Sequence, residues 1–344
     1  RTKQHVREGV RRMSAAIRSS VGAVAIGKNE GERLKVCLQS LARQVSHVVY
    51  VDSGSSDGSV EFARSVDADV VELDPAIPFT AARARNAGVE RLAQIASELK
   101  YAQLIDGDCE LVEGWVEEAV GFLDTNEEYA AAAGRLRERF PDASVFNYLC
   151  DVEWNTPVGE AKSCGGIAMM RIRAFESVGG FLPDLIAGEE PELCVRLRRA
   201  GWKIRRLDEE MALHDVAMTR VSQWWRRAMR AGHAYAEGSY LHGAPPERMW
   251  VRESRRIVAW GLLLPGLALA FGPLTNGLSL LLLLAYPVNV IRIALRLQRE
   301  GKARPWALAF FLMLGKLPEA IGWMRFQYGR RTGKRSSIIE HKRA

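Results

Sequence analysis

The chain has 344 residues, which is enough for one large domain with an appendage. Its charges are unevenly distributed, since positions 248–344 hold 17 basic and 4 acidic residues while positions 1–247 hold 31 and 37. An acidic globular part followed by a basic, apolar tail argues against a nucleic-acid binder. It is typical of a soluble domain held on an anionic membrane surface. We therefore expect membrane lipids, and no nucleic acid, among the partners.

The N-terminal residues and the cysteines bear on the cellular compartment. Residues 1–20 predict a basic, partly helical lead-in, and no apolar run of signal-peptide length follows, so we expect no secretion signal. None of the five cysteines belongs to a Cys-x-x-Cys pair, and their spacing suits no zinc site. We interpret them as reduced thiols of a cytoplasmic protein.

Strand and helix patterns alternate after the lead-in. Short apolar runs predict strands at 21–26, 47–52, 68–73 and 101–106, and helical patterns lie between them at about 30–44, 57–66 and 80–98. This alternation predicts an α/β fold with a doubly wound, mostly parallel sheet. Further strands are expected at 130–137, 166–171 and 202–207, with a helix at 190–200. Ligands bind at the carboxyl ends of strands in such sheets, so Asp52 and Asp106, which each end a strand, should face one crevice.

Asp106 and Asp108 lie two positions apart at the end of a predicted strand, where Gly107 can turn both carboxylates toward one site. Such a pair suits Mg²⁺ or Mn²⁺, which are hard ions that take oxygen ligands and bridge phosphates. An Asp-x-Asp triplet on its own is more often a solvated turn. The surrounding motifs therefore decide between the two interpretations.

Four short motifs surround this pair in a fixed order. They are Asn29-Glu30 after a strand, then Val51-Asp52-Ser53-Gly54-Ser55-Ser56-Asp57-Gly58, then Ala84-Arg85-Asn86-Ala87-Gly88 at a helix start, and finally Ile105-Asp106-Gly107-Asp108. Together they resemble the nucleotide-sugar-binding half of family 2 glycosyltransferases, which have the GT-A fold. The resemblance covers about residues 20–235 and implies an enzyme, a glycosyltransferase of the hexosyltransferase type.

The resemblance also implies roles for residues of the first half. Asp108 is expected to hold the metal ion, Mg²⁺ or Mn²⁺. Asp52, Glu30 and Arg85 are expected to hold the base, ribose and diphosphate of a nucleotide-sugar donor, with UDP favoured. Asp106 is expected to contact the ribose or the metal.

Residues 164–181 and 187–204 resemble the acceptor side of the same family. Glu190 stands where the family usually has the Asp of a Glu-Asp motif, and this departure leaves Glu189 as a rival for the catalytic base. The structural alternative is a helix N-terminus, where the macrodipole favours acidic residues. A base here would activate an acceptor hydroxyl, and the resemblance implies a single displacement with inversion at the sugar.

Two later segments contribute candidate residues. His214 follows a predicted strand, and a late histidine completes the metal shell in some GT-A enzymes, although a packed or solvated histidine is an equal alternative. The segment 222–238 contains Trp224 and neighbouring arginines and predicts an amphipathic helix at the membrane interface. Arg226 or Arg230 of this helix could meet a lipid-linked diphosphate.

The last third of the chain predicts membrane association. Residues 257–291 contain no charge and are interrupted by prolines and glycines, which predicts a hairpin of two short membrane helices turning near 273–277, with shallow re-entry as the alternative. The segment 305–324 contains Lys316 and Glu319, so it could span the membrane or lie on it. Basic flanks place both hairpin ends on the cytoplasmic side.

The sequence thus predicts a lead-in at 1–20, a GT-A domain at 21–245 and membrane-associated helices with a basic tail at 246–344. Within the domain, 21–110 is expected to form the nucleotide-sugar half, and 111–245 the acceptor half and the interfacial helix. We expect sugar transfer to a polyprenyl-linked acceptor at the cytoplasmic face of a bacterial inner membrane, in polysaccharide synthesis. Transfer to a polyprenyl phosphate is one alternative, and a non-catalytic nucleotide-sugar-binding membrane scaffold is another.

Overall fold

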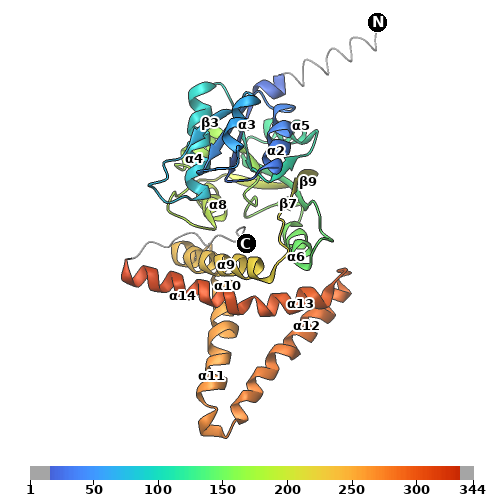
Figure 1. The fold of residues 1–344 in the computed structure, drawn as a ribbon, viewed down its shortest axis with the longest axis vertical. Coiled ribbons are helices and arrows are strands. Elements are labelled where there is room, and N and C mark those ends of the chain that lie inside the picture. Colours follow the sequence, from blue (N-terminus) through green and yellow to red (C-terminus); the bar gives the residue numbers. More distant parts are fainter. Residues whose placement is uncertain (1–15, 334–344) are drawn as a thin grey trace. The chain divides into compact units, whose positions relative to one another are not determined.

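A computed structural model describes residues 16–333 of the chain, which form two compact units (Figure 1). Of these residues, the first unit contains 16–142 together with 150–185 and 189–217. The second contains 143–149, 186–188 and 218–333. Most of the predicted lead-in, and the basic tail beyond residue 333, lie outside the described residues.

A nine-stranded mixed sheet forms the first unit, with the order β3-β2-β1-β4-β8-β6-β9-β5 and with β7 also paired to β9. The first four strands are mutually parallel, as the sequence predicted, whereas β8 runs antiparallel to both β4 and β6. The strands are β1 (Val21–Gly27), β2 (His47–Asp52), β3 (Asp69–Glu72), β4 (Tyr101–Asp106), β5 (Cys109–Leu111), β6 (Tyr129–Glu138), β7 (Gly159–Glu160), β8 (Ala168–Arg171) and β9 (Lys203–His214).

Helices cover both faces of the parallel part, so every residue of β1 is buried. The helices that pack on the parallel strands are α2 (Glu32–Ala42), α3 (Ser59–Ser65) and α4 (Ala81–Ile95). On the other strands pack α5 (Trp115–Thr125), α7 (Ile172–Ser177) and α8 (Glu189–Arg199), and α6 (Val145–Trp154) belongs partly to each unit. Gly88 brings α4 against β1, because a Cβ at this position would lie 2.2 Å from Cγ1 of Val24. This close approach fixes the start of α4, and therefore Arg85, beside the carboxyl ends of the strands.

The sheet order reverses at β1, which lies between β2 and β4. A reversal of this kind opens a crevice at the carboxyl ends of the strands. In the register Gly27 pairs with Asp52 and Ile26 pairs with Asp106, so the two aspartates flank the end of β1. The structure therefore places both aspartates at the edge of the sheet where the sequence predicted a shared crevice.

The second unit is helical. It contains α9 (Val221–His242), α10 (Val251–Ile257), η1 (Val258–Leu263), α11 (Leu264–Ala270), η2 (Pro273–Thr275), η3 (Leu278–Leu284), α12 (Ala285–Arg299), α13 (Pro305–Leu314) and α14 (Lys316–Thr332). The chain reverses between α11 and η3, where Asn276 and Gly277 have φ angles of 49° and 84°. This hairpin turns where the sequence predicted it (Figure 1).

Helix α9 packs along α14, at a crossing made by two glycines. A Cβ at Gly232 would lie 2.0 Å from the Glu319 carbonyl oxygen, and one at Gly322 would lie 1.9 Å from the Met229 carbonyl oxygen. The second unit therefore begins before α9, whereas the sequence placed the boundary at 245/246. Trp224 of α9 is 8% exposed, since it packs on Phe311 with ring centroids 5.0 Å apart rather than facing outward.

Two continuous helical stretches are long and apolar enough to cross a membrane by length and composition. Leu278–Arg299 has a mean hydropathy of 2.0, and only 6% of its most apolar window is buried. Pro305–Thr332 is less apolar, at 1.3, and 39% of its window is buried, in keeping with its packing on α9. The first stretch therefore fits a membrane environment better than the second.

Candidate functional site

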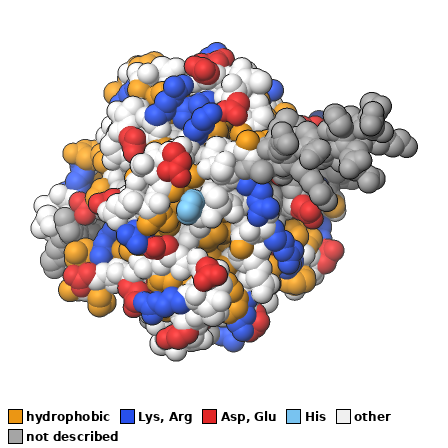
Figure 2. All heavy atoms as spheres, turned by 90° about the horizontal axis from the view of Figure 1, so that it is seen from above, with side chains coloured by type: hydrophobic (Ala, Val, Ile, Leu, Met, Phe, Trp, Pro, Cys, Tyr) orange, Lys and Arg blue, Asp and Glu red, His pale blue; other side chains and the backbone are white. Residues whose placement is uncertain are grey.

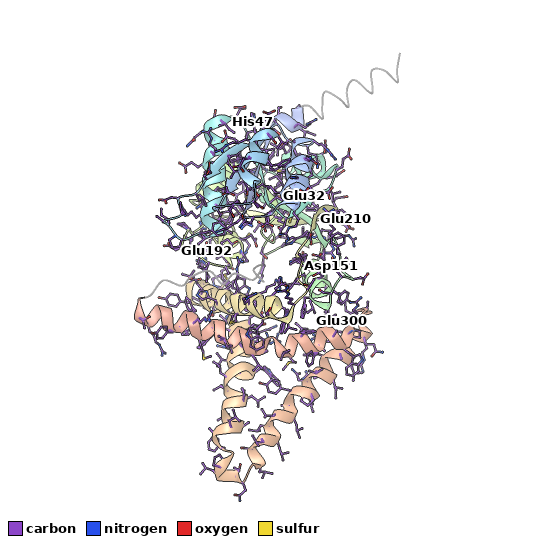
Figure 3. The ribbon with its side chains drawn as sticks, viewed as in Figure 1. Glu32, His47, Asp151, Glu192, Glu210 and Glu300 are labelled. Carbon is purple, nitrogen blue, oxygen red and sulfur yellow. The ribbon has the colours of Figure 1, made fainter. Side chains whose placement is uncertain are left out.

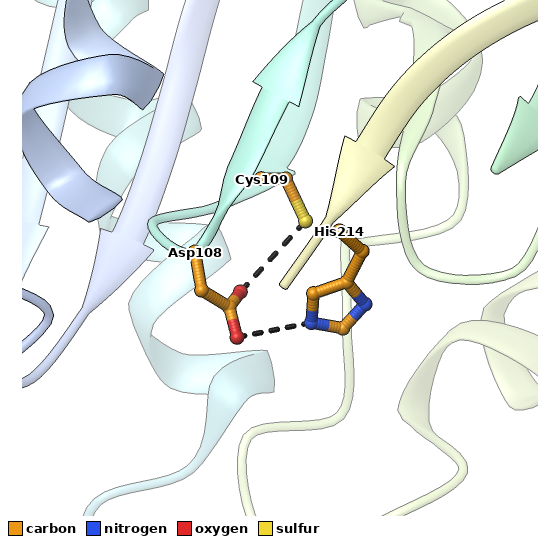
Figure 4. Close-up of side chains that lie close together, drawn as sticks. All are labelled: Asp108, Cys109 and His214. Carbon is orange, nitrogen blue, oxygen red and sulfur yellow. Dashed lines mark hydrogen bonds and ion pairs between the residues drawn. The ribbon is translucent and has the colours of Figure 1, made fainter. Parts of the chain in front are cut away.

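The carboxylate of Asp108, two residues after the end of β4, lies beside the imidazole of His214, the last residue of β9 (Figure 4). The Asp108 Oδ2 and His214 Nε2 atoms are 2.9 Å apart. Strand β5 pairs with β9 so that Cys109 lies opposite His214, which brings Asp108 beside the last residue of β9. The carboxylate is almost fully buried, while the imidazole keeps 13% of its surface exposed. The structure thus brings together two residues that the sequence separates by 106 positions.

This pair of donors fits a divalent cation. Bonds of about 2.1 Å at right angles place neighbouring ligand atoms about 3 Å apart, which is close to the observed separation. A carboxylate oxygen and an imidazole nitrogen are both accepted by Mn²⁺ and, less readily, by Mg²⁺. The Cys109 thiol lies 3.7 Å from Asp108 Oδ1. Its soft sulfur suits neither ion, so the carboxylate and the imidazole are the ligands that fit.

Trp154, which belongs to none of the sequence motifs, orients His214. The Trp154 ring stacks on the imidazole with centroids 4.6 Å apart and an interplanar angle of 20°. The end of α6 that carries it is held by Asp151, which accepts from Arg135 of β6 at 2.8 Å (Figure 3). Because Trp154 lies 60 positions before His214, no local pattern in the sequence could have indicated this contact.

Arg85 is a buried clamp between two candidate site residues. Its guanidinium donates to Asp106 Oδ1 at 2.8 Å and to Glu189 Oε1 at 2.7 Å. The arginine side chain is 3% exposed, against 34% for Asp106 and 11% for Glu189. Burial works against its charge, but the two carboxylates outweigh burial and raise the pKa of Arg85. The sequence assigned this residue to the donor diphosphate, whereas its guanidinium here contacts two protein carboxylates.

Glu189 and Glu190 begin α8 but have different surroundings. Glu189 belongs to the Arg85 clamp. Glu190 is 4% exposed, and its Oε1 accepts from the Cys164 backbone N–H at 2.5 Å and from the Cys194 thiol at 2.9 Å. Burial raises the pKa of the Cys194 thiol, and the nearby Glu190 carboxylate adds to the effect. The protonated thiol therefore remains a donor to Glu190.

The remaining predicted donor-side residues are also buried at this edge. Asp52 is 2% exposed, and its Oδ2 accepts from the backbone N–H groups of Gly54 and Ser55, both at 2.8 Å. Glu30 pairs with Arg33 at 2.8 Å. Asp52 therefore shapes the Gly/Ser-rich turn after β2. Arg226 and Arg230 lie on α9, which belongs to the other unit.

The exposed face seen in Figure 2 mixes acidic and basic side chains without a large area of one sign. Such mixing is typical of a solvated protein surface. The five cysteines are buried and none forms a disulfide, in agreement with the interpretation of the cysteines as reduced thiols.

Comparison with known proteins connects this chain to one family. Residues 24–155 match the family described as glycosyl transferase family 2, and residues 104–317 match glycosyl transferase family group 2. The glycosyltransferase AglE of Haloferax volcanii is 25% identical over 55% of this chain and 64% of its own length. The succinoglycan biosynthesis protein ExoA of Rhizobium meliloti is 26% identical over 63% of this chain and 69% of its own length. The match to AglE thus spans less than two thirds of that protein.

A solved structure has the same fold. The mannosyltransferase PcManGT from Pyrobaculum calidifontis, in complex with GDP-Man and Mn²⁺, superposes with a TM-score of 0.60 at 19% identity. The alignment covers 89% of this chain and 87% of that one. The predicted GT-A fold is confirmed, and because a family match extends over more than half of its residues, the chain belongs to the family 2 glycosyltransferases.

Proposed function

We propose that this protein is a metal-dependent glycosyltransferase that moves a sugar, with inversion, from a nucleotide-sugar donor to a polyprenyl-linked acceptor. The observation that carries the proposal is the Asp108–His214 pair, with Oδ2 and Nε2 2.9 Å apart at the carboxyl edge of a doubly wound sheet. A carboxylate and an imidazole at a topological switch point suit a cation that faces a bound phosphate group.

Asp108 and His214 would hold Mg²⁺ or Mn²⁺, with Trp154 keeping the imidazole ring in place. The cation, when bound, neutralises charge that develops on the nucleoside diphosphate leaving group. PcManGT was solved with Mn²⁺, which supports Mn²⁺ as the first ion to test. Its donor there is GDP-Man, so a GDP-sugar is to be tested beside the UDP-sugar that the motifs favour.

The other candidate site residues would bind the donor and activate the acceptor. Arg85 holds Asp106 and Glu189 in fixed positions, so Asp106 offers its second oxygen to the donor ribose. Glu30 and Asp52 order the loops around the base. A carboxylate of α8 takes the proton of the acceptor hydroxyl as that oxygen attacks the anomeric carbon. We assign this role to Glu190, through Oε2, because Oε1 already holds two donors.

The second unit would attach the enzyme to the membrane. The hairpin arm Leu278–Arg299, which is more apolar and less buried than the later stretch Pro305–Thr332, supports insertion. The basic residues at the two ends of the hairpin support a cytoplasmic location for these ends. The acceptor would then be reached at the cytoplasmic face of a bacterial inner membrane. The names of the relatives support a role in glycan synthesis, since one is a succinoglycan biosynthesis protein.

A transfer assay tests the proposal. Membranes that contain the protein are incubated with radiolabelled UDP- or GDP-sugars and Mn²⁺, and the label is followed into the organic phase. We expect incorporation that stops with excess chelator and in the Asp108→Ala variant. Donor binding without any transfer would identify a non-catalytic scaffold, and transfer that survives Glu190→Gln would indicate a phosphate acceptor, which needs no strong base.

A further inference from the structure

The second unit contains a cavity of about 920 Å³ at the open side of the hairpin. Its walls come from α10, η1, α12, α13 and the first residue of α14. Apolar side chains such as Trp260, Leu295 and Leu312 line it, and the last two are 45% and 49% exposed. A cavity with exposed aliphatic walls can accept a hydrocarbon chain, since this burial removes apolar area from water.

Five cations line the same cavity, and Glu253 is the only acidic residue among its lining residues. Two of the cations have protein partners: Lys316 lies 2.5 Å from Glu319, and Arg296 lies 3.6 Å from Glu300, just past the end of α12 (Figure 3). For the other three, Arg256, Arg292 and Arg299, residues 16–333 supply no ion pair. An apolar cavity lined by cations without an acidic partner suits a ligand that has both a hydrocarbon chain and an anionic headgroup.

The spacing of the arginines indicates more than one phosphate. Arg292, Arg296 and Arg299 recur at intervals of four and three, so they follow one face of α12. At 1.5 Å per residue, the first and last lie about 10 Å apart along the helix axis. Arg256 faces the same cavity from α10. A row of this length can pair with two phosphates of one headgroup better than with a single phosphate.

We propose that this cavity binds one phospholipid whose headgroup carries two phosphodiester groups, with an acyl chain along the apolar walls. The inference rests on the membrane attachment proposed above, but not on the sugar-transfer reaction. Arg256, Arg292 and Arg299 pair with the phosphates, and the aliphatic face of α12 contacts the chain. The site is distinct from α9, where Arg226 and Arg230 are located. A lipid held here ties both arms of the hairpin to the headgroup layer.

The chain offers a matched control for the test. Arg255 and Arg256 are neighbours in the last turn of α10 and both are exposed, but only Arg256 lines the cavity. Arg331 is likewise exposed and lies outside it. The variant pair Arg256→Gln with Arg292→Gln therefore removes two cavity charges. The pair Arg255→Gln with Arg331→Gln removes two charges of the same sign elsewhere, so general attraction to an anionic surface falls equally in both.

Full-length protein in nanodiscs of neutral phosphatidylcholine is supplied with diphosphatidylglycerol, phosphatidylglycerol at equal phosphate, or a prenyl diphosphate, and bound lipid is counted by native mass spectrometry. We expect one diphosphatidylglycerol per chain. Its affinity should fall about 30-fold in the cavity variant, or about 2 kcal/mol for two cations, and change less than about 3-fold in the control. Equal losses in both variants, equal retention of phosphatidylglycerol, or preference for the prenyl diphosphate overturns the proposal.

A carbonate wash of native membranes separates this inference from the proposed function. Protein that stays in the membrane but shows no lipid preference overturns the lipid site alone. Protein that is released overturns the attachment and the lipid site together. Nucleotide-sugar binding by the first unit, measured in the same preparations, should be the same in both variants, because neither changes a residue of that unit. Equal melting temperatures of the variants verify that the helices remain folded.

Discussion

Replacing Arg85 by leucine should destabilise the first unit strongly. The change removes the guanidinium and leaves Glu189, 11% exposed, as a buried carboxylate without its cation. Removing one partner of a buried pair typically costs about 3–5 kcal/mol. Asp106 is about one third exposed and can be rehydrated. Losing its ion pair with Arg85 therefore adds less than about 1 kcal/mol to the cost. We therefore expect Arg85→Leu to cost about 3–5 kcal/mol in total.

The assay is thermal unfolding followed by circular dichroism and by binding of a fluorescent nucleotide. For a unit of this size 1 kcal/mol corresponds to about 2–4 °C, so the unfolding temperature should fall by about 10 °C. Arg83→Leu is the matched control, because Arg83 lies on the same turn of α4 and its side chain donates only to the backbone carbonyls of Ile77 and Asp74. That control should cost less than about 1 kcal/mol.

A double-mutant cycle locates the cause. If the buried charge of Glu189, once it has lost Arg85, is what destabilises Arg85→Leu, adding Glu189→Gln should restore about 2–3 kcal/mol, because a neutral amide costs less to bury. The reasoning is refuted if Arg85→Leu melts within about 2 °C of the wild type and loses only donor affinity. Arg85 would then act as the diphosphate ligand that the family resemblance implies.

Four further results are expected. Asp108→Ala should abolish turnover and metal-dependent nucleotide binding while circular dichroism stays unchanged; full activity in excess chelator would contradict the metal site. Glu190→Gln should lower kcat by about 10²-fold or more with donor affinity kept, and Glu189→Gln should do less; the reverse order would assign the base to Glu189. Burial, aided by Arg325, lowers the pKa of His233 from 6.5 to about 4, despite Glu237 at 3.5 Å. The folded state therefore loses about 3 kcal/mol as the pH falls from 6.5 to 4, and His233→Gln should flatten that dependence in pH-dependent melting curves. A chain that ends at residue 217 should still bind donor but leave the membrane fraction, and its retention there would place the anchor in the first unit.

The strand ends of the site could be predicted from the sequence because local signals fix them. The apolar runs before Asp52 and Asp106 define β2 and β4 to the residue, and parallel pairing brings both ends to one edge of the sheet. The sequence did not decide whether His214 is a metal ligand or a packed histidine. Strand β9 extends through Asp208, Glu209 and Glu210, and these charged residues are not typical of a strand, so only its first half was predicted. The register of β9 with β5 nevertheless places His214 beside Asp108.

The surroundings of the base candidates could not be predicted. Cys164 and Cys194 lie 30 positions apart, yet their sulfur atoms are 3.8 Å apart and both residues donate to Glu190 Oε1. Their separation matches no spacing rule, because it is set by how α8 packs beside the segment that precedes β8. The same holds for Arg85, whose motif indicated a ligand contact while its tertiary neighbours are carboxylates. Motifs locate such residues, but their partners come from packing.

The boundary between the two units also could not be predicted from local sequence signals, because it depends on how two distant helices pack. The Pro245-Pro246 pair and the change in composition placed it after α9, because these are the strongest local breaks. The structure places it before α9, whose small residues accept α14 about 90 positions later in the chain. Gly232 and Gly322 allow the two backbones to touch, and larger side chains at either position would push the helices apart. A cut between α9 and α10 would therefore uncover the face of α9 that α14 buries, whereas a cut before Met218 removes both helices together. For a helix whose partner lies this far along the chain, small residues on one face are a better sign of where it belongs than the nearest break in the sequence.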